Sequence, residues 1–300
     1  MTLSSQKLKI IVVLGLTASG KSDLAVRLAR QFNGEIISAD SRQVYRGMDL
    51  GTGKITKKEM RGVPHYLLDV ASPKQRFTAA QYKKLALAAI KKIQRKNKIP
   101  IICGGTGFYI QTITDNLSLP AVKPDLKLRA KLGKLATNKL YEKLQKLDPR
   151  RAKNIDRHNR RRLIRALEIV LKTGQPVPKI KAASPFNVLL IGIKKSQPDL
   201  ARRIKIRLQK RLKQGMLAEV KRLRAQGLSW KKLDSFGLEY RWLARYLQKK
   251  VSYTEMITRL QKDIEHYAKR QTTWFKKISR IIWFKNYRAT TLTIKKFLTD

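Results

Sequence analysis

An eight-residue segment matching the pattern G-x-x-x-x-G-K-S limits the folds open to this chain. It comprises Gly15, Leu16, Thr17, Ala18, Ser19, Gly20, Lys21 and Ser22. An apolar run leads into it and a helical pattern follows it, which is the strand–loop–helix context of a phosphate-binding loop. There the backbone N–H groups surround phosphate oxygens, Lys21 supplies a positive charge and the Ser22 hydroxyl can bind Mg²⁺. The motif predicts binding of a diphosphate or triphosphate without specifying ATP hydrolysis.

The pattern of apolar residues predicts an α/β fold in which helices flank a P-loop-type parallel sheet. Short apolar runs typical of buried strands lie at residues 10–16, 35–39, 99–103 and 188–193. Helical patterns over residues 22–32 and 79–94 separate the first three runs. Alternating strands and helices of this kind indicate a doubly wound sheet.

Residues 116–185 differ in pattern from the rest of the chain. They contain charged helical stretches and no apolar strand, and prolines mark both borders. This pattern predicts an inserted all-helical subdomain, which leaves residues 1–115 and 186–300 to form the α/β core. The end of the core contains two long basic amphipathic stretches, at residues 199–226 and 252–277.

The charge balance indicates a polyanionic partner. Lys and Arg number 68 against 20 Asp and Glu, giving a formal net charge of +48. A generally lysine-rich proteome could raise the charge without any one partner. However, residues 150–165 hold seven arginines and residues 201–224 hold ten basic residues, and clustered arginine suits phosphate.

The remaining composition excludes several classes of protein. Apolar residues make up 42% of the chain, too many for a disordered basic tail. No apolar run approaches the roughly 20 residues that cross a bilayer, so we expect a soluble, cytoplasmic protein without a membrane segment. We also expect it to be a monomer. The one cysteine, Cys103, excludes an internal disulfide and a multi-cysteine zinc site. Any metal must therefore have oxygen ligands.

One predicted strand ends in a carboxylate and another does not. Residues 99–103 are followed by Gly104, Gly105 and Thr106, whereas a nucleotide hydrolase usually has an acidic residue at such a strand end. Residues 35–39 are followed by Asp40, which either caps the next turn or faces the crevice beyond the strand ends as a base.

Four segments together resemble the tRNA dimethylallyltransferases of bacterial type. They are residues 15–22, residues 37–52 (ISADSRQVYRGMDLGT), residues 104–109 (GGTGFY) and residues 267–275 (YAKRQTTWF). The resemblance spans nearly the whole chain in the right order. It implies transfer of a dimethylallyl group from dimethylallyl diphosphate to the N6 amine of the adenosine immediately 3′ of the tRNA anticodon, with release of diphosphate.

The resemblance also implies roles for individual residues. Asp40 would be the general base, Thr106 would contact the diphosphate near the breaking bond, and the P-loop with Mg²⁺ on Ser22 would hold the leaving group. An arginine after the fourth strand would bridge the diphosphate. Arg203, Arg207 and Arg211 share a helix face, and Arg207 fits the spacing of the family best.

Further residues would contact the anticodon stem-loop of tRNA. The resemblance implies such contacts for Asp40, Ser41, Arg42 and Gln43, which would hold a flipped adenosine, for Arg161, Arg162 and Arg165 in the insertion, and for Lys269, Arg270 and Gln271 near the end of the chain. The apolar side of the insertion helix would leave its arginines free to meet phosphate. Trp274 and Phe275 are predicted to be core residues.

The chain departs from the family in two places. It has Glu239-Tyr240 where many members have Gly-Tyr, and either Lys127 or Arg129 stands where arginine is usual. Three other functions share some of these features: a P-loop nucleoside or metabolite kinase, a prenyltransferase acting on free AMP, and a non-catalytic RNA-binding protein. The lack of an acidic residue after residues 99–103 and the basic surface argue against the kinase, and the arginine-rich insertion argues against an enzyme for free AMP. A protein that only binds RNA would not need the Lys21-Ser22 pair or Asp40.

Overall fold

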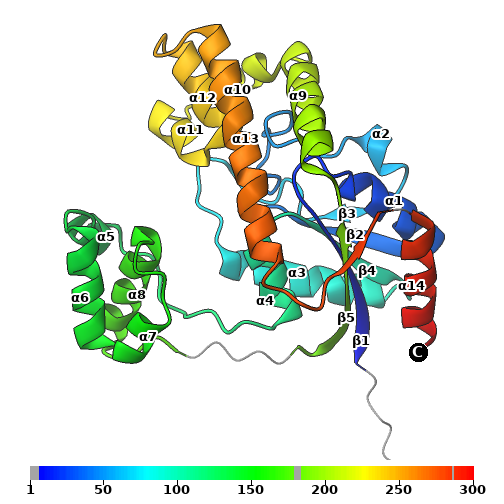
Figure 1. Ribbon diagram of the computed structural model, residues 1–300, viewed down its shortest axis with the longest axis horizontal. Helices are drawn as coiled ribbons and strands as arrows, with labels where there is room; N and C mark the ends of the chain where they lie inside the picture. The colour runs from blue at the N-terminus through cyan, green and yellow to red at the C-terminus, as the bar shows by residue number, and fades with distance from the viewer. Residues whose placement is uncertain (1–6, 179–183, 286) are drawn as a thin grey trace, which may run out of the picture. The chain divides into compact units, whose positions relative to one another are not determined.

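The computed structural model describes residues 7–178, 184–285 and 287–300. The chain divides into two compact units, Met1–Asn116 with Ser184–Asp300, and Leu117–Ala183. No helix in the described residues is long and apolar enough to span a membrane. Most elements of both units are labelled in Figure 1.

The first unit is built on a six-stranded, wholly parallel sheet with the order β3-β2-β4-β1-β5-β6. The strands are β1 (Leu8–Leu14), β2 (Gly34–Ala39), β3 (His65–Tyr66), β4 (Ile99–Gly104), β5 (Phe186–Ile193) and β6 (Ile282–Phe284). The predicted fold class and all four predicted strands are confirmed. The first strand ends at Leu14 because Gly15 and Leu16 already belong to the loop. The predictions missed β3 and β6, which are too short to show a period.

Both faces of the sheet are covered by helices, as a buried parallel sheet requires. The flanking helices are α1 (Lys21–Gln31), α3 (Ala79–Gln94), α4 (Gly107–Thr114) and α14 (Tyr287–Thr299). The short helix α2 (Lys57–Met60) buries no residue. Along β1, alternate side chains enter different cores: Ile10 and Val12 share one with α3, while Ile11 and Val13 share the other with α1 and α14.

Five helices gather beyond the carboxyl ends of the strands (Figure 1). They are α9 (Gln197–Lys213), α10 (Met216–Ala225), α11 (Trp230–Phe236), α12 (Leu238–Leu247) and α13 (Tyr253–Phe275). The predicted stretch 199–226 is two helices because Gly215 has a φ of 97°, which breaks the helix. The stretch 252–277 forms the single helix α13, as predicted.

The second unit contains helices and loops, but no strand, in its described residues. It contains α5 (Leu126–Gly133), α6 (Thr137–Leu147), α7 (Pro149–Lys153) and α8 (Arg160–Thr173). The apolar face of α8 supplies Leu163, Ala166, Leu167 and Val170 to its core, where they meet Leu140 and Leu144 of α6.

Candidate active site

The loop of residues 15–20 joins β1 to α1 and is shaped to receive an anion. Ala18 and Gly20 have positive φ values, which turn the backbone around the start of α1, and no side chain caps that helix. The Lys21 ammonium folds back across the loop and donates to the Leu16 carbonyl at 3.2 Å. The Ser19 hydroxyl is buried and has no hydrogen-bond partner among the described residues. A phosphate oxygen would satisfy these groups and the free N–H groups of the helix start.

Gln271 of α13 ties this loop to the segment after β4. Its Oε1 accepts from the Thr17 N–H at 2.8 Å, and its Nε2 donates to the Gly105 carbonyl at 2.9 Å. We expected Gln271 to contact tRNA, but the structure places its side chain inside the protein with both polar ends in use. Lys269 and Arg270, the two residues directly before Gln271 on α13, are exposed.

Asp40 and Thr106 are brought together by the pairing of β2 with β4. Ala39 and Gly104 are partners in the sheet, the Thr106 N–H donates to Ala39, and the Ser41 N–H donates to Thr106 Oγ1 at 3.0 Å. Asp40 Oδ1 accepts from the N–H groups of Arg42 at 2.8 Å and Gln43 at 3.3 Å. Asp40 therefore caps the turn that follows it. Its Oδ2 makes no hydrogen bond to any described residue, so one oxygen remains for another partner.

Three arginines on successive turns of α9 reach different parts of the same site. Arg203 Nε donates to the Ala18 carbonyl of the loop at 2.8 Å, and Arg207 Nη2 donates to the Gly53 carbonyl at 3.1 Å. Arg211 Nη1 pairs with Glu239 Oε1 at 3.2 Å. The predicted shared face therefore points toward the P-loop, with Arg207 in the middle.

The cations of this site perturb one another. Burial lowers the pKa of Lys21. The positive charges of Arg207 and Arg211 lower it further, and the negative charge of Asp40 opposes them. Burial and the Arg211 charge lower the pKa of Arg207 to about 10, so it is still protonated at neutral pH. Like charges held this close repel one another, and a bound diphosphate would relieve that repulsion.

These residues can be set beside known proteins. Residues 43–278 match the model of the family described as IPP transferase. The chain belongs to this family. It is 42% identical to the tRNA dimethylallyltransferase of Limosilactobacillus reuteri strain DSM 20016, over 97% of this chain and 98% of that protein. It is 40% identical to the tRNA dimethylallyltransferase of Thermoanaerobacter pseudethanolicus, over the same shares of the two chains.

Solved structures of the IPP transferase family have the same fold. The crystal structure of the full-length tRNA isopentenylpyrophosphate transferase of Bacillus halodurans matches 98% of this chain with a TM-score of 0.73, at 34% identity and 96% coverage of that chain. A structure of a eukaryotic dimethylallyltransferase acting on tRNA matches 93% of this chain with a TM-score of 0.79, at 27% identity and 74% coverage of that chain. The predicted resemblance is confirmed.

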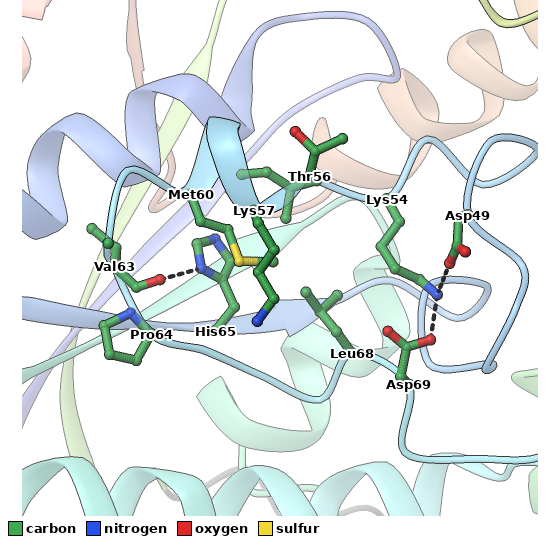
Figure 2. Close-up of a pocket in the computed structure, with 12 residues that line it drawn as sticks. Asp49, Lys54, Thr56, Lys57, Met60, Val63, Pro64, His65, Leu68 and Asp69 are labelled. Atoms are coloured by element: carbon green, nitrogen blue, oxygen red, sulfur yellow. Dashed lines mark hydrogen bonds and ion pairs between the residues drawn. The ribbon is translucent and has the colours of Figure 1, made fainter. Parts of the chain in front are cut away.

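A cavity of about 630 Å³ lies beside the site of this IPP transferase, between residues 54–57 and 62–69. In Figure 2 the Lys54 ammonium lies between Asp49 and Asp69, at 2.6 and 2.5 Å, so its charge is balanced. None of the predicted site residues lines this cavity. A smaller cavity shares Ile55, His65 and Leu68 with it and reaches Ser22 and Gln43. No motif in the sequence indicated the larger cavity, whereas Ser22 and Gln43 in the lining of the smaller one belong to two of the motifs.

The predicted tRNA-contacting arginines of the second unit fall into two groups. Arg161 and Arg162 are exposed on the first turn of α8. We expected Arg165 to be free for phosphate, and this was wrong. Its guanidinium donates to Glu168 Oε2 at 2.5 Å and to the Val122 carbonyl at 3.0 Å. Arg129 binds the same carboxylate through two hydrogen bonds, whereas Lys127 is exposed. The buried carboxylate of Glu168 therefore engages Arg165, which the resemblance assigned to tRNA, together with Arg129.

Glu168 should make the stability of the second unit depend on pH in the acidic range. Burial alone would raise its pKa, but the hydrogen bonds from Arg129, the Asp125 N–H and Arg165 outweigh burial and lower the pKa to about 2. Because the pKa is lower in the folded state, Glu168 stabilises the unit above its unfolded pKa, about 4.3. That stabilisation is lost as the pH falls from there toward about 2.

We expect Glu168→Gln to destabilise the unit by about 3 kcal/mol at neutral pH, the lower end for a broken buried ion pair, because two partly exposed arginines lose the carboxylate that both of them bind. Hydrogen exchange of α6 and α8 measures this locally. The control is Glu142→Gln, which removes an exposed pair with Lys139 in the same unit and should change exchange very little. Equal exchange in the two variants at pH 7 would show that the Glu168 pairs do not hold the unit together.

The departure at Glu239-Tyr240 also has a structural explanation. Both side chains are buried at the start of α12 and point inward, Glu239 to Arg211 and Tyr240 to Glu219. They do not lie on the surface, so they are unlike a tRNA contact. Trp274 is half-buried and Phe275 is buried, as predicted for core residues.

Proposed function

We propose that this IPP transferase moves a dimethylallyl group from dimethylallyl diphosphate to the N6 amine of the adenosine immediately 3′ of the anticodon in tRNA. The observation that carries this reading is the single site in which the P-loop, Lys21 and Arg207 lie beside the free carboxylate oxygen of Asp40. Cations suit the leaving diphosphate, and a carboxylate suits the attacking amine.

The cations of the site contribute the larger part of the rate enhancement. An allylic carbon ionises readily, so the barrier falls mainly through neutralisation of the charge that develops on diphosphate. Lys21 and the loop N–H groups approach this charge from one side, and Arg207 approaches from α9. Thr106, held beside Asp40 by its bond to Ser41, would contact the diphosphate near the breaking bond. Each well-placed donor of this kind contributes roughly 10²- to 10³-fold.

Asp40 takes the proton that the amine loses as its bond to carbon forms. An aromatic amine is a weak nucleophile, so a base acting in the transition state contributes about 10²- to 10⁴-fold. The adenosine must leave its stack to reach Asp40, which costs a few kcal/mol. Ser41, Arg42 and Gln43 follow Asp40 directly and would hold the flipped nucleotide. Arg42 is already oriented by the Phe236 carbonyl, which accepts from its Nε at 2.9 Å.

Mg²⁺ fits the donor set of this site. No cluster of three or more His, Cys, Asp or Glu side chains able to hold a metal occurs in the described part of the chain. Mg²⁺ commonly binds through one or two protein oxygens, phosphates and water, and the Ser22 hydroxyl at the start of α1 would be such a ligand. When bound, the ion would add positive charge at the diphosphate.

The exposed basic residues of both units would hold the phosphates of the tRNA. Those proposed are Arg161 and Arg162 of α8 and Lys269 and Arg270 of α13. If all four neutralise phosphates, they should contribute about 3 log units of affinity loss per log unit of salt. The double variant Arg161→Ala, Arg162→Ala should reduce this slope by about 1.5.

Binding of fluorescent tRNA over a series of salt concentrations measures the slope. The matched control removes two exposed lysines from α14, in Lys295→Ala, Lys296→Ala, and should leave the slope unchanged. If the affinity of the wild type for tRNA does not change with salt, the basic residues do not bind tRNA phosphates. The net charge of +48 would then be a general feature of the composition.

The proposed reaction is tested by incubating the protein with Mg²⁺, dimethylallyl diphosphate and unmodified tRNA, in parallel with AMP as the acceptor. Mass spectrometry of the nucleosides should find prenylated adenosine only in the tRNA sample. Product from AMP would identify a free-nucleotide enzyme. No product from either acceptor would reject the proposal, and ATP turnover would then test for a kinase.

A further inference from the structure

Glu219 of α10 and Tyr240 of α12 form a buried pair that the proposed reaction does not use directly. Each is 2% exposed, and the Tyr240 hydroxyl donates to Glu219 Oε1 at 2.7 Å. Burial and the charge of Glu219 raise the pKa of Tyr240 well above its usual value. The hydroxyl therefore keeps its proton and remains the donor to the carboxylate.

The Glu219 carboxylate also accepts three consecutive backbone N–H groups. Its Oε2 accepts from Asp49 at 2.9 Å and Leu50 at 2.7 Å, and its Oε1 accepts from Gly51 at 3.0 Å. A Cβ on Gly51 would lie 2.6 Å from the Tyr240 ring, so only glycine permits this approach. Bonds from N–H groups to a carboxylate are stronger than those between neutral groups. Side chains of α10 and α12 therefore hold one short segment, residues 49–51, in place.

That segment determines where the Gly53 carbonyl lies. The Gly53 N–H donates to the Leu50 carbonyl at 3.1 Å, which forms a turn that begins within residues 49–51. The Gly53 carbonyl accepts from Arg207 Nη2 at 3.1 Å and from Gln43 Nε2 at 3.2 Å. A Cβ at Gly53 would collide with the Arg207 and Arg211 guanidinium groups. The position of this turn therefore fixes the direction of Arg207.

We propose that Glu219 and Tyr240 are positioning residues for prenyl transfer, which place the Gly53 carbonyl so that it orients the Arg207 guanidinium toward the diphosphate. The inference rests on the proposed function, in which Arg207 neutralises the leaving group. A donor that is oriented before the reaction does not have to reorganise during it. A displacement of about 1 Å at a reacting group can cost about 10²-fold in rate.

A second buried carboxylate in the same unit provides a matched control. Glu35 is 1% exposed at the start of β2, and it accepts from the Tyr66 hydroxyl at 2.7 Å. Lys96 and Lys98 pair with it at 3.1 and 3.0 Å. Asp40 follows the other end of the same strand. Tyr66→Phe therefore removes the same kind of hydrogen bond as Tyr240→Phe, but far from the proposed site.

The test measures kcat, the KM for dimethylallyl diphosphate and the melting temperature of Tyr240→Phe, Glu219→Gln and Tyr66→Phe. We expect Tyr240→Phe to lower kcat about 10-fold and Glu219→Gln to lower it about 10²-fold, because Arg207 acts on charge that develops in the transition state. The KM should change much less than kcat. Tyr66→Phe should lower the melting temperature as Tyr240→Phe does while leaving kcat unchanged.

Calorimetric binding of inorganic diphosphate supplies a readout that needs no prenyl transfer. Its affinity should fall in Tyr240→Phe and stay constant in Tyr66→Phe. The inference is overturned if Tyr240→Phe keeps both the kcat and the diphosphate affinity of the wild type, or if the two phenylalanine variants lose them equally. A different outcome separates the two proposals. If the wild type gives no prenyl product, the proposed function is rejected. If Tyr240→Phe nevertheless weakens diphosphate binding and Tyr66→Phe does not, the positioning role still stands.

Discussion

Lys21→Ala should lower the rate of prenyl transfer at least about 10²-fold while leaving the affinity for tRNA within about twofold. The Lys21 ammonium crosses the loop to the Leu16 carbonyl, where it would meet the diphosphate. Its loss removes one of the cations that would neutralise the charge developing on the diphosphate. Because tRNA would bind through exposed residues elsewhere, its affinity should not depend on this side chain. Single-turnover prenylation and tRNA binding, measured on the same preparation, check both parts.

Lys9→Ala is the control for this prediction. Lys9 lies near the other end of β1, where its ammonium donates to the Leu298 carbonyl at 2.9 Å, so its loss also removes one lysine from the strand–loop segment. This variant should transfer the prenyl group at the wild-type rate. A Lys21→Ala protein with normal turnover and weakened tRNA binding would contradict the assignment of the loop to diphosphate.

The sheet and the P-loop could be predicted because their signals are local. Continuous apolar runs reveal strands buried on both faces, and the loop sequence lies where one such strand meets a helix. The same reasoning placed Asp40 after β2 and Thr106 after β4. That the two residues lie near each other follows from the neighbouring positions of those strands, which the sheet order supplies and a periodic pattern does not.

The roles of long polar side chains could not be predicted in this way. Gln271 and Arg165 each lie in a basic stretch that the resemblance assigns to tRNA. Their polar side-chain groups instead form hydrogen bonds within the protein, with Thr17 and Glu168. The Thr17 contact joins residues that are 254 positions apart. A long side chain can point to solvent or inward from the same backbone position, and only the tertiary structure selects between the two.

Asp40→Asn should lower kcat by about 10²- to 10⁴-fold with little change in the binding of either substrate. The turn needs only an acceptor at the position of Oδ1, and an asparagine carbonyl can accept from the N–H groups of Arg42 and Gln43 in the same way. The amide cannot take a proton, so the variant removes the base and keeps the cap. Measurement of kcat together with the KM of both substrates separates these effects.

Asp40→Ala completes the argument because it removes the base and the cap together. It should match the loss of kcat in Asp40→Asn and in addition weaken tRNA binding, since Ser41, Arg42 and Gln43 lose the turn that holds them. Asp69→Asn, which changes a half-exposed carboxylate paired with Lys54, should leave both quantities unchanged. If Asp40→Asn were fully active and only Asp40→Ala impaired, Asp40 would be a turn cap alone. The proton would then have to leave the amine for another acceptor or for water.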